Sequence, residues 1–179
     1  MTDDTRIKNE LRREFHIIKI NRHIDFTKVS AIVVLCAEET NIEGENKQRI
    51  DAGIQLLQNM EEKKFLFLGT KFHIAYLKKY IDKKSDITLL FPMHREHESS
   101  RTQIISLAKY CIKNHFGHIV IVSHAYHIPR IKRYCVAYLS AQKYDFYPVG
   151  DINSQSQRID NEIEKIIKYA KKGDLPLFI

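Results

Sequence analysis

Short runs of hydrophobic residues recur along the chain, separated by segments in which hydrophobic residues are spaced three or four positions apart. Apart from the last, the runs are too continuous for half-exposed strands and indicate strands buried on both faces of a sheet. They are SAIVVLC (30–36), FLFLG (65–69), ITLLF (87–91), HIVIV (118–122) and YDFYPV (144–149). The segments between them have helical spacing, and a last helix carries one apolar stripe, formed by Ile159, Ile163, Ile166 and Ala170.

Strand and helix thus alternate five times, which predicts parallel strands joined by right-handed crossovers with helices on both faces. The predicted fold class is three-layer α/β, as one Rossmann-like domain over residues 1–179. Residues 1–25 form an N-terminal helical extension and residues 150–179 a C-terminal helix and tail. In the extension, an amphipathic helix from about Asp4 to Asn21 could pack its Leu11, Phe15 and Ile18 on the sheet or on another subunit.

Composition agrees with a compact domain and gives an expected address. The chain has 179 residues, of which 44% are hydrophobic, with only six glycines and four prolines. No apolar run approaches the roughly 20 residues of a membrane span. The first residues, MTDDTRIKNELRREF, lack the apolar centre of a signal peptide. The three cysteines form no CxxC pair, so we expect buried thiols and a cytoplasmic protein.

The formal charge of +7 suits an anionic partner. The lysines are scattered in KK pairs, as at solvated helix ends, which does not favour nucleic-acid binding. A small anionic or nucleotide-like molecule is the partner we expect, and the oligomeric state stays open.

Ligands of open α/β sheets bind beyond the carboxyl ends of the strands. The segment SHAYHIPR (123–130) follows the fourth strand. Pro129 favours the first turn of a helix, so a helix is predicted to begin at about Ile128, just after His127. Arg130 then lies in the first turn, where the helix dipole disfavours a cation by about 0.3–1 kcal/mol. An arginine in this position is typical of a functional site.

The segment after the third strand repeats this arrangement. Ser100 and Gln103 have the spacing of a capping box, which predicts Arg101 and Thr102 in the first turn of the next helix. Two arginines at two helix starts predict a site for phosphate, sulfate or carboxylate. For Arg101, an exposed charge beside a good cap is an equal alternative.

Other chemistries receive less support from the sequence. His94 and His97, and His124 and His127, form HxxH pairs, but this spacing on a loop fixes no geometry, and we predict no metal. His124 is expected at the strand end, facing away from His127. There is no GxGxxG and no GxxxxGK[ST], and no GxSxG or recognisable triad surrounds the two candidate nucleophiles, Ser123 and Cys36.

These residues together resemble the SanA/ElyC/YdcF-like family of bacterial domains of unknown function, in its soluble, YdcF-like form. The resemblance covers about the central 110 residues. It rests on the segments AIVVL (31–35), RIDAGIQLL (49–57), LGT (68–70), ESSRT (98–102) and SHAYHIPR, the last being similar to the family's T-x-x-Y-H-M-x-R. Ile104 and Ile105 stand where the family often has glutamate and asparagine.

The resemblance implies a sheet of order 3-2-1-4-5, a link to cell-envelope metabolism, and nucleotide-like or S-adenosylmethionine-type ligands. It implies a polar site at the matching residues, with Gly69 in a tight turn. The candidates are His127 and Arg130 as catalytic residues and, for ligand binding, Arg49, Gly69, Thr70, Ser99, Arg101, Thr102, Ser123 and Tyr126. In this order the third and fourth strand ends lie about 14–15 Å apart, so residues 92–99 must lean inward to complete the site.

Two hypotheses from different functional classes follow. In the first, the protein is an enzyme for phosphoryl or pyrophosphoryl hydrolysis or transfer, in which Arg49 and Arg130 hold the anion and His127 transfers a proton. In the second, it is a non-catalytic binding module for a nucleotide-like or S-adenosylmethionine-type ligand.

Overall fold

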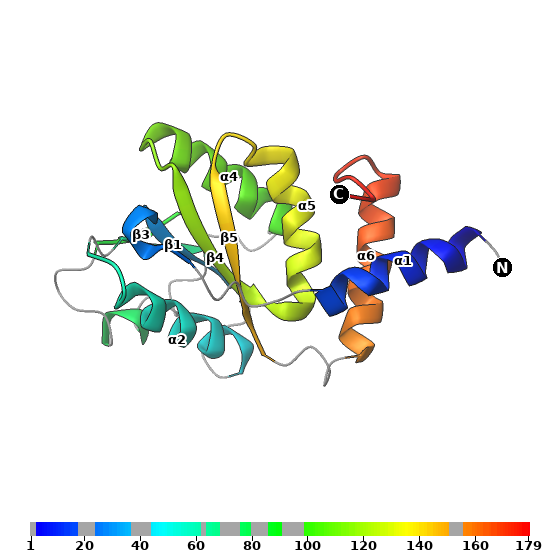
Figure 1. Ribbon diagram of the computed structural model, residues 1–179, viewed down its shortest axis with the longest axis horizontal. Coiled ribbons are helices and arrows are strands. Elements are labelled where there is room, and N and C mark those ends of the chain that lie inside the picture. The colour runs from blue at the N-terminus through cyan, green and yellow to red at the C-terminus, as the bar shows by residue number, and fades with distance from the viewer. Residues whose placement is uncertain are drawn as a thin grey trace.

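A five-stranded parallel sheet of order β3-β2-β1-β4-β5 forms the centre of the molecule (Figure 1). The computed structural model describes residues 3–17, 24–36, 44–61, 64–68, 76–79, 86–90, 99–150 and 156–179. The strands are β1 (Ala31–Leu35), β2 (Lys64–Leu68), β3 (Asp86–Leu89), β4 (His118–His124) and β5 (Lys143–Val149). Both the three-layer α/β class and the strand order expected from the sequence are confirmed.

Helices cover both faces of this sheet. Their bounds are α1 (Asp3–Ile17), α2 (Glu45–Leu57), α4 (Ser100–Lys113), α5 (Ile128–Tyr138) and α6 (Ser156–Lys171), with short 3-10 turns η1 (Phe26–Lys28) and η2 (Ala125–His127). The helix predicted at about Ile128 begins there, with Pro129 in its first turn. The predicted stripe of the last helix is confirmed on α6, where its three isoleucines are buried.

The central strand β1 shows why its sequence is uniformly hydrophobic. All five of its residues are buried, and alternate side chains enter opposite cores because successive side chains of a strand point to opposite faces. Val33 and Leu35 pack in the core under α4, α5 and α6, whereas Ile32 and Val34 pack in the core under α2. A strand with two buried faces favours an unbroken hydrophobic run.

The N-terminal helix α1 packs against α6, at the end of the molecule farthest from β3 (Figure 1). Leu11 and Phe15 are fully buried and join the core that contains Ile163 and Ile166. Glu14 accepts hydrogen bonds from both terminal nitrogens of the buried Arg133 on α5, at 2.9 and 2.8 Å. The predicted hydrophobic face of α1 therefore covers its own chain, while Ile18 lies outside the described residues.

The crossovers leave neighbouring strands β1 and β4 toward opposite faces. After β1 the chain enters α2 on one face, and after β4 it enters α5 on the other (Figure 1). The carboxyl ends of β1 and β4 therefore flank the point at which an open α/β sheet forms its ligand crevice. Within the described ranges, no helix combines the length and the apolar character needed to cross a bilayer.

Gly53 lets α2 approach the sheet closely. A Cβ atom added there would lie 2.5 Å from Cγ2 of Val34, which is closer than real Cβ atoms come, and 3.0 Å from Cε2 of Phe65, which is a tight contact. Arg49 precedes Gly53 by about one helical turn and is buried on the same helix. The close approach of α2 thus sets the depth at which Arg49 enters the protein.

Candidate functional site

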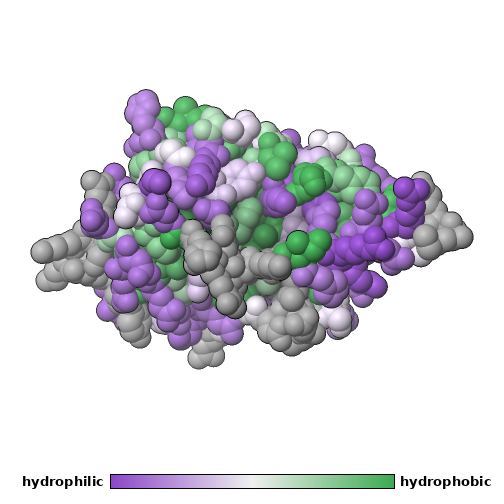
Figure 2. All heavy atoms as spheres, viewed as in Figure 1, coloured by the Kyte–Doolittle hydropathy of each residue, from purple (hydrophilic) through white to green (hydrophobic). Residues whose placement is uncertain are grey.

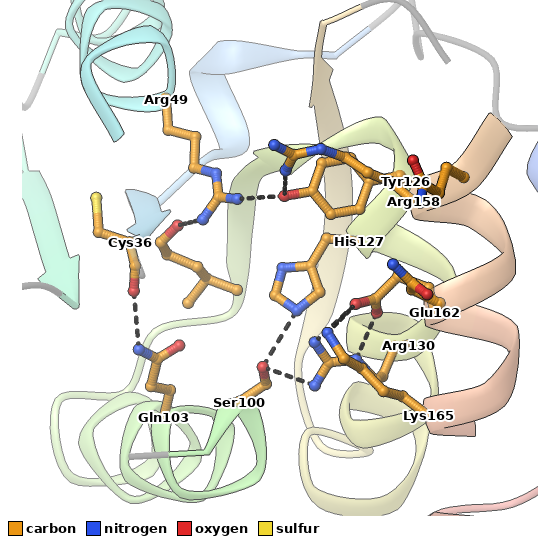
Figure 3. Close-up of a pocket in the computed structure, with 13 residues that line it drawn as sticks. Cys36, Arg49, Ser100, Gln103, Tyr126, His127, Arg130, Arg158, Glu162 and Lys165 are labelled. Carbon is orange, nitrogen blue, oxygen red and sulfur yellow. Dashed lines mark hydrogen bonds and ion pairs between the residues drawn. The ribbon is translucent and has the colours of Figure 1, made fainter. Parts of the chain in front are cut away.

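A cavity of about 600 Å³ lies at the carboxyl ends of the central strands (Figure 3). Its lining comes from the end of β1, from α2, from the first turn of α4, from the segment joining β4 to α5, and from one face of α6. These residues are Leu35, Cys36, Arg49, Ser100, Gln103, Tyr126, His127, Arg130, Gln157, Arg158, Asn161, Glu162 and Lys165. The cavity lies at the edge of the sheet at which a ligand site is expected from the sequence.

Arg49 joins α2 to the ends of two strands. Its Nη1 donates to the carbonyl oxygen of Leu35 at 3.0 Å, and its Nε donates to Nδ1 of His124 at 2.7 Å. Its side chain is only 3% exposed. A buried guanidinium with these contacts is fixed in orientation, so Arg49 is a rigid part of the cavity wall.

His124 at the end of β4 is held in one tautomer. Because a guanidinium only donates, Nδ1 of His124 must accept from Arg49, and its Nε2 proton then points to Oε1 of Gln48 at 3.1 Å. Burial and the positive charge of Arg49 lower the pKa of His124 to about 4. The sequence placed His124 at the strand end, and the structure confirms this position and adds its role as an acceptor for Arg49.

Tyr126 links Arg49 to a carboxylate and to a second arginine. Its hydroxyl donates to Oε2 of Glu45 at 2.5 Å and accepts from Nη1 of Arg158 at 3.0 Å. The Arg158 guanidinium also pairs with Glu45 and lies over the Tyr126 ring, 5.1 Å from its centroid. Burial and the hydrogen bond to Glu45 raise the pKa of Tyr126. Arg49 and Arg158 therefore share one carboxylate, that of Glu45.

Glu162 is the second carboxylate of the site. Its Oε2 accepts from Nε of Arg130 at 2.6 Å, and its Oε1 accepts from Nη2 of Arg130 at 3.3 Å and from Nζ of Lys165 at 2.9 Å (Figure 3). Glu162 is 2% exposed. This buried pair compensates the unfavourable position of Arg130 in the first turn of α5.

His127 lies between Arg49 on one side and the pair of Arg130 and Glu162 on the other (Figure 3). Its Nδ1 is 3.1 Å from Oγ of Ser123 and its Nε2 is 3.1 Å from Oγ of Ser100. Burial, followed by the positive charges of Arg130 and Arg49, lowers the pKa of His127 well below 6.5. The ring is therefore neutral near pH 7, with one nitrogen able to accept a proton.

The start of α4 differs by one residue from the prediction. The capping box is formed by Ser99 and Thr102, whose side chains each bond the backbone amide of the other residue, and not by Ser100 and Gln103. Ser100 is thereby free of a capping role, and its hydroxyl accepts from Nη1 of Arg130 at 3.1 Å. Arg101 points elsewhere, with Nε on the Tyr138 hydroxyl at 2.9 Å and Nη1 3.2 Å from Asp174.

The structure brings together five of the candidate residues around the cavity. These are Arg49, Ser123, Tyr126, His127 and Arg130; Ser123 reaches the cavity only through His127, because it is itself fully buried. It does not bring Ser99, Arg101 or Thr102 to the lining. Gly69 and Thr70 lie outside the described residues.

The largest part of the site that the sequence did not reveal is the face of α6. Five residues of this helix line the cavity: Gln157, Arg158, Asn161, Glu162 and Lys165. Their spacing is that of a solvent-facing polar stripe beside the buried isoleucines, so the pattern alone did not distinguish them. One signal was available, since Glu162 follows the buried Ile159 by three positions and so lies beside the apolar stripe.

Charges around the cavity do not balance. The four cations Arg49, Arg130, Arg158 and Lys165 share the two carboxylates of Glu45 and Glu162. With His127 neutral, the part of the site that the structure describes keeps an excess of two positive charges. Since part of this charge is removed from water, an anion entering the cavity is attracted more strongly than at an exposed site.

Hydrophilic residues prevail on the face shown in Figure 2, and hydrophobic residues there form small separate patches. Among the described residues, no group of three or more histidine, cysteine, aspartate or glutamate side chains is arranged to hold a metal ion. His94 and His97 lie outside those residues. The cavity and its arginines are thus the candidate site.

Comparison of the chain with protein-family models, with curated proteins and with solved structures found no match. The geometry and charge of the cavity therefore indicate what the protein can bind.

Proposed function

We propose that the cavity binds a small phosphorylated or nucleotide-like anion, and that the protein hydrolyses or transfers a phosphoryl or pyrophosphoryl group of this ligand. One observation carries the proposal: four cations share two carboxylates around a cavity that also contains a neutral histidine. Among the described residues, the two positive charges that remain equal in size the charge of a phosphate dianion.

The surrounding elements support an anionic group. Ser100 is the first residue of α4 and Arg130 lies in the first turn of α5, so two helix N-termini open toward the cavity. Helix N-termini carry unpaired amide protons and partial positive charge, which stabilise phosphate groups. Arg130 and Lys165 add charged donors at the same place.

The carboxamides of Gln157 and Asn161 support the nucleotide-like part of the proposal. Both residues line the cavity and lie within one turn of Arg158 on α6, whose guanidinium lies over the Tyr126 ring. A carboxamide can both donate and accept, so it can pair with the edge of a base or with a sugar hydroxyl. A phosphate held by the cations would leave these groups for the rest of the ligand.

His127 supplies the proton transfer. In the free protein its positive form is disfavoured by burial and by neighbouring cations, so the ring holds no second proton near pH 7. A bound dianion would offset those cations and make the imidazolium form easier to reach. The base therefore becomes effective when the anion is in place.

Titration calorimetry with inorganic phosphate, pyrophosphate and ADP tests binding, and phosphorus NMR of phosphate esters, pyrophosphates and adenosyl compounds tests turnover. Arg130→Ala should weaken binding by at least tenfold, whereas the matched variant Lys132→Ala, an exposed cation on the same helix, should bind normally. His127→Gln should bind and lose turnover by about 100-fold or more. Absence of binding to every anion would exclude the proposal. Binding without any turnover would leave the non-catalytic binding module as the function.

A further inference from the structure

The hydroxyl of Ser100 has an environment unlike that of the other serines near the cavity. Ser99 caps α4, and Ser123 is fully buried beneath His127. Ser100 is half-buried and lines the cavity, with Oγ 3.1 Å from Nε2 of His127 and 3.1 Å from Nη1 of Arg130. Its hydroxyl thus contacts a neutral histidine and a cation at the same time.

The donors and acceptors around Ser100 can be assigned from chemistry. Arg130 can only donate, so Oγ of Ser100 accepts from it, and the hydroxyl proton is available to Nε2 of His127. His127 accepts this proton if its own ring proton is on Nδ1, where Oγ of Ser123 lies 3.1 Å away to receive it. The three residues then form a continuous relay, Ser100 to His127 to Ser123.

This relay has the parts of an activated nucleophile. A base within hydrogen-bond reach removes the hydroxyl proton, and a third group orients the base. Arg130 and the N-terminus of α4 both place positive charge beside Oγ, which stabilises the alkoxide that forms. Ser123 does not act as the nucleophile, because it orients His127 from the buried side.

We propose that Ser100 is the catalytic nucleophile of the site and that the reaction passes through a phosphoserine intermediate at Oγ. The proposal rests on the function proposed above and extends it to the identity of the attacking atom. In the first step, the Ser100 Oγ to phosphorus bond forms as the bond from phosphorus to the leaving oxygen breaks. The hydroxyl proton passes to Nε2 of His127 and then to the leaving oxygen.

In the second step, water attacks phosphorus and the bond from phosphorus to Oγ breaks. A proton from this water passes to His127 and then to Oγ, which restores the serine and releases inorganic phosphate. If another hydroxyl compound replaces water, the same step transfers the phosphoryl group to it. Neither step needs an oxidant, a reductant or a cofactor.

The test uses acetyl phosphate as a small phosphoryl donor, with an acid quench, intact-mass measurement and peptide mapping. The unchanged protein should gain one phosphoryl group, located on Ser100. Ser100→Ala should gain none, and His127→Gln should be labelled at least about 100-fold more slowly. Ser140→Ala, a matched change at an exposed serine after α5, should be labelled like the unchanged protein.

The outcomes separate this inference from the proposed function. Turnover of phosphate compounds without any label on Ser100, or turnover retained in Ser100→Ala, would overturn the nucleophile and leave the proposed function standing. Label on a different residue would also overturn it. Absence of both label and turnover would overturn both the inference and the catalytic function. Because the label is sought on the unchanged protein, the test does not depend on the folding of a variant.

Discussion

Arg49 on α2 donates from Nε to Nδ1 of His124, at the end of β4, over a distance of 2.7 Å. The two residues are 75 positions apart and both are buried. A hydrogen bond from a charged donor to a neutral imidazole is strong when both groups are removed from water. This bond fixes the orientation of both side chains. This contact joins the helix on one face of the sheet to the strand that leads into the segment with Tyr126 and His127.

Arg49→Lys should destabilise the fold although it keeps the charge. Lysine cannot reproduce the planar fork that donates to Leu35 and His124 together, and a buried acceptor left without a donor is costly. We expect a loss of about 1.5–3 kcal/mol in the free energy of unfolding, measured by urea denaturation. Lys47→Ala on the same helix removes an exposed pair with Asp51 and a contact with the Tyr76 ring, and should cost clearly less than Arg49→Lys. Equal losses for the two variants would contradict this role of Arg49.

Glu162→Gln should lower stability and raise anion affinity. The change leaves Arg130 and Lys165 without their buried partner, which should cost about 3 kcal/mol in unfolding free energy. It also increases the positive charge of the cavity, so inorganic phosphate should bind roughly tenfold more tightly, or about 1.4 kcal/mol.

The neighbouring Glu164 provides the control for this change. It is exposed on the same helix and pairs with Lys8, so Glu164→Gln should alter neither quantity appreciably. Calorimetry on both variants measures their stability and their affinity for phosphate. Weaker phosphate binding by a folded Glu162→Gln protein would show that the carboxylate assists the anion instead of opposing it.

Gly53→Ala should disturb the site from a distance. The added methyl group would meet Val34 and Phe65 and push α2 away from the sheet, at a cost of about 1–3 kcal/mol. The outward shift would also withdraw Arg49 from Leu35 and His124. We therefore expect a lower melting temperature together with weaker phosphate binding. Ala52→Gly, a neighbouring change outside this close contact, is the control. Normal phosphate binding by a destabilised Gly53→Ala protein would contradict the link between the position of α2 and anion binding.

The fold was predictable because its signals are local. A strand buried on both faces requires an unbroken hydrophobic run, and AIVVL in β1 meets this requirement without reference to the rest of the chain. The start of α5 was equally local, since Pro129 restricts where a helix can begin. For the hydrophobic run of β1 and for Pro129, the residue types themselves favour the structure that is found.

The site was predictable only in part, because the side chains that pair within it are distant in sequence. Ser99 and Ser100 each have a polar residue three positions later, so either could cap α4. In the structure Ser99 caps α4, and Ser100 instead contacts His127 and Arg130, which are distant in sequence. Similarly, Arg130 was recognised as an unfavourable cation, but its compensation by Glu162 comes from a helix 32 residues later.

The stability of the protein should fall as the pH is lowered through the histidine range. His124 has a pKa of about 4 when folded, and the pKa of His127 is also lowered, whereas unfolded histidine titrates near 6.5. Between these values the unfolded state binds more protons, so the free energy of unfolding rises with pH. The loss on acidification should begin near pH 6.5 and continue toward pH 4.

Urea denaturation between pH 5 and 7.5 measures this slope. His124→Gln removes one titrating group while keeping an acceptor near Arg49, so its slope between pH 6.5 and 5 should be shallower than that of the unchanged protein. Above pH 7 the two curves should run parallel. Identical slopes over the lower range would mean that His124 is protonated in the folded state.

Anion binding should be coupled to protonation of His127. In the free protein, Arg130, Arg49 and Lys165 help to keep the pKa of this buried ring low, and a dianion in the cavity would oppose their effect. The pKa of His127 should therefore rise on binding, and the protein should take up a proton at mildly acidic pH. Sulfate is the suitable probe, because it does not itself titrate in this range. Calorimetry in two buffers of different ionisation enthalpy counts the protons taken up.

The expected result is uptake that grows as the pH falls from 7 to 5.5, and its loss in His127→Gln. His124→Gln should retain the proton uptake. In the unchanged protein, Arg49 and Gln48 hold the His124 ring in place, so this ring takes no part in the uptake. A binding enthalpy that is the same in both buffers at every pH would mean that bound sulfate does not alter His127. In that case the base of the proposed reaction would have to be sought elsewhere, since a ring that stays unprotonated beside a dianion cannot hold the proton of Ser100.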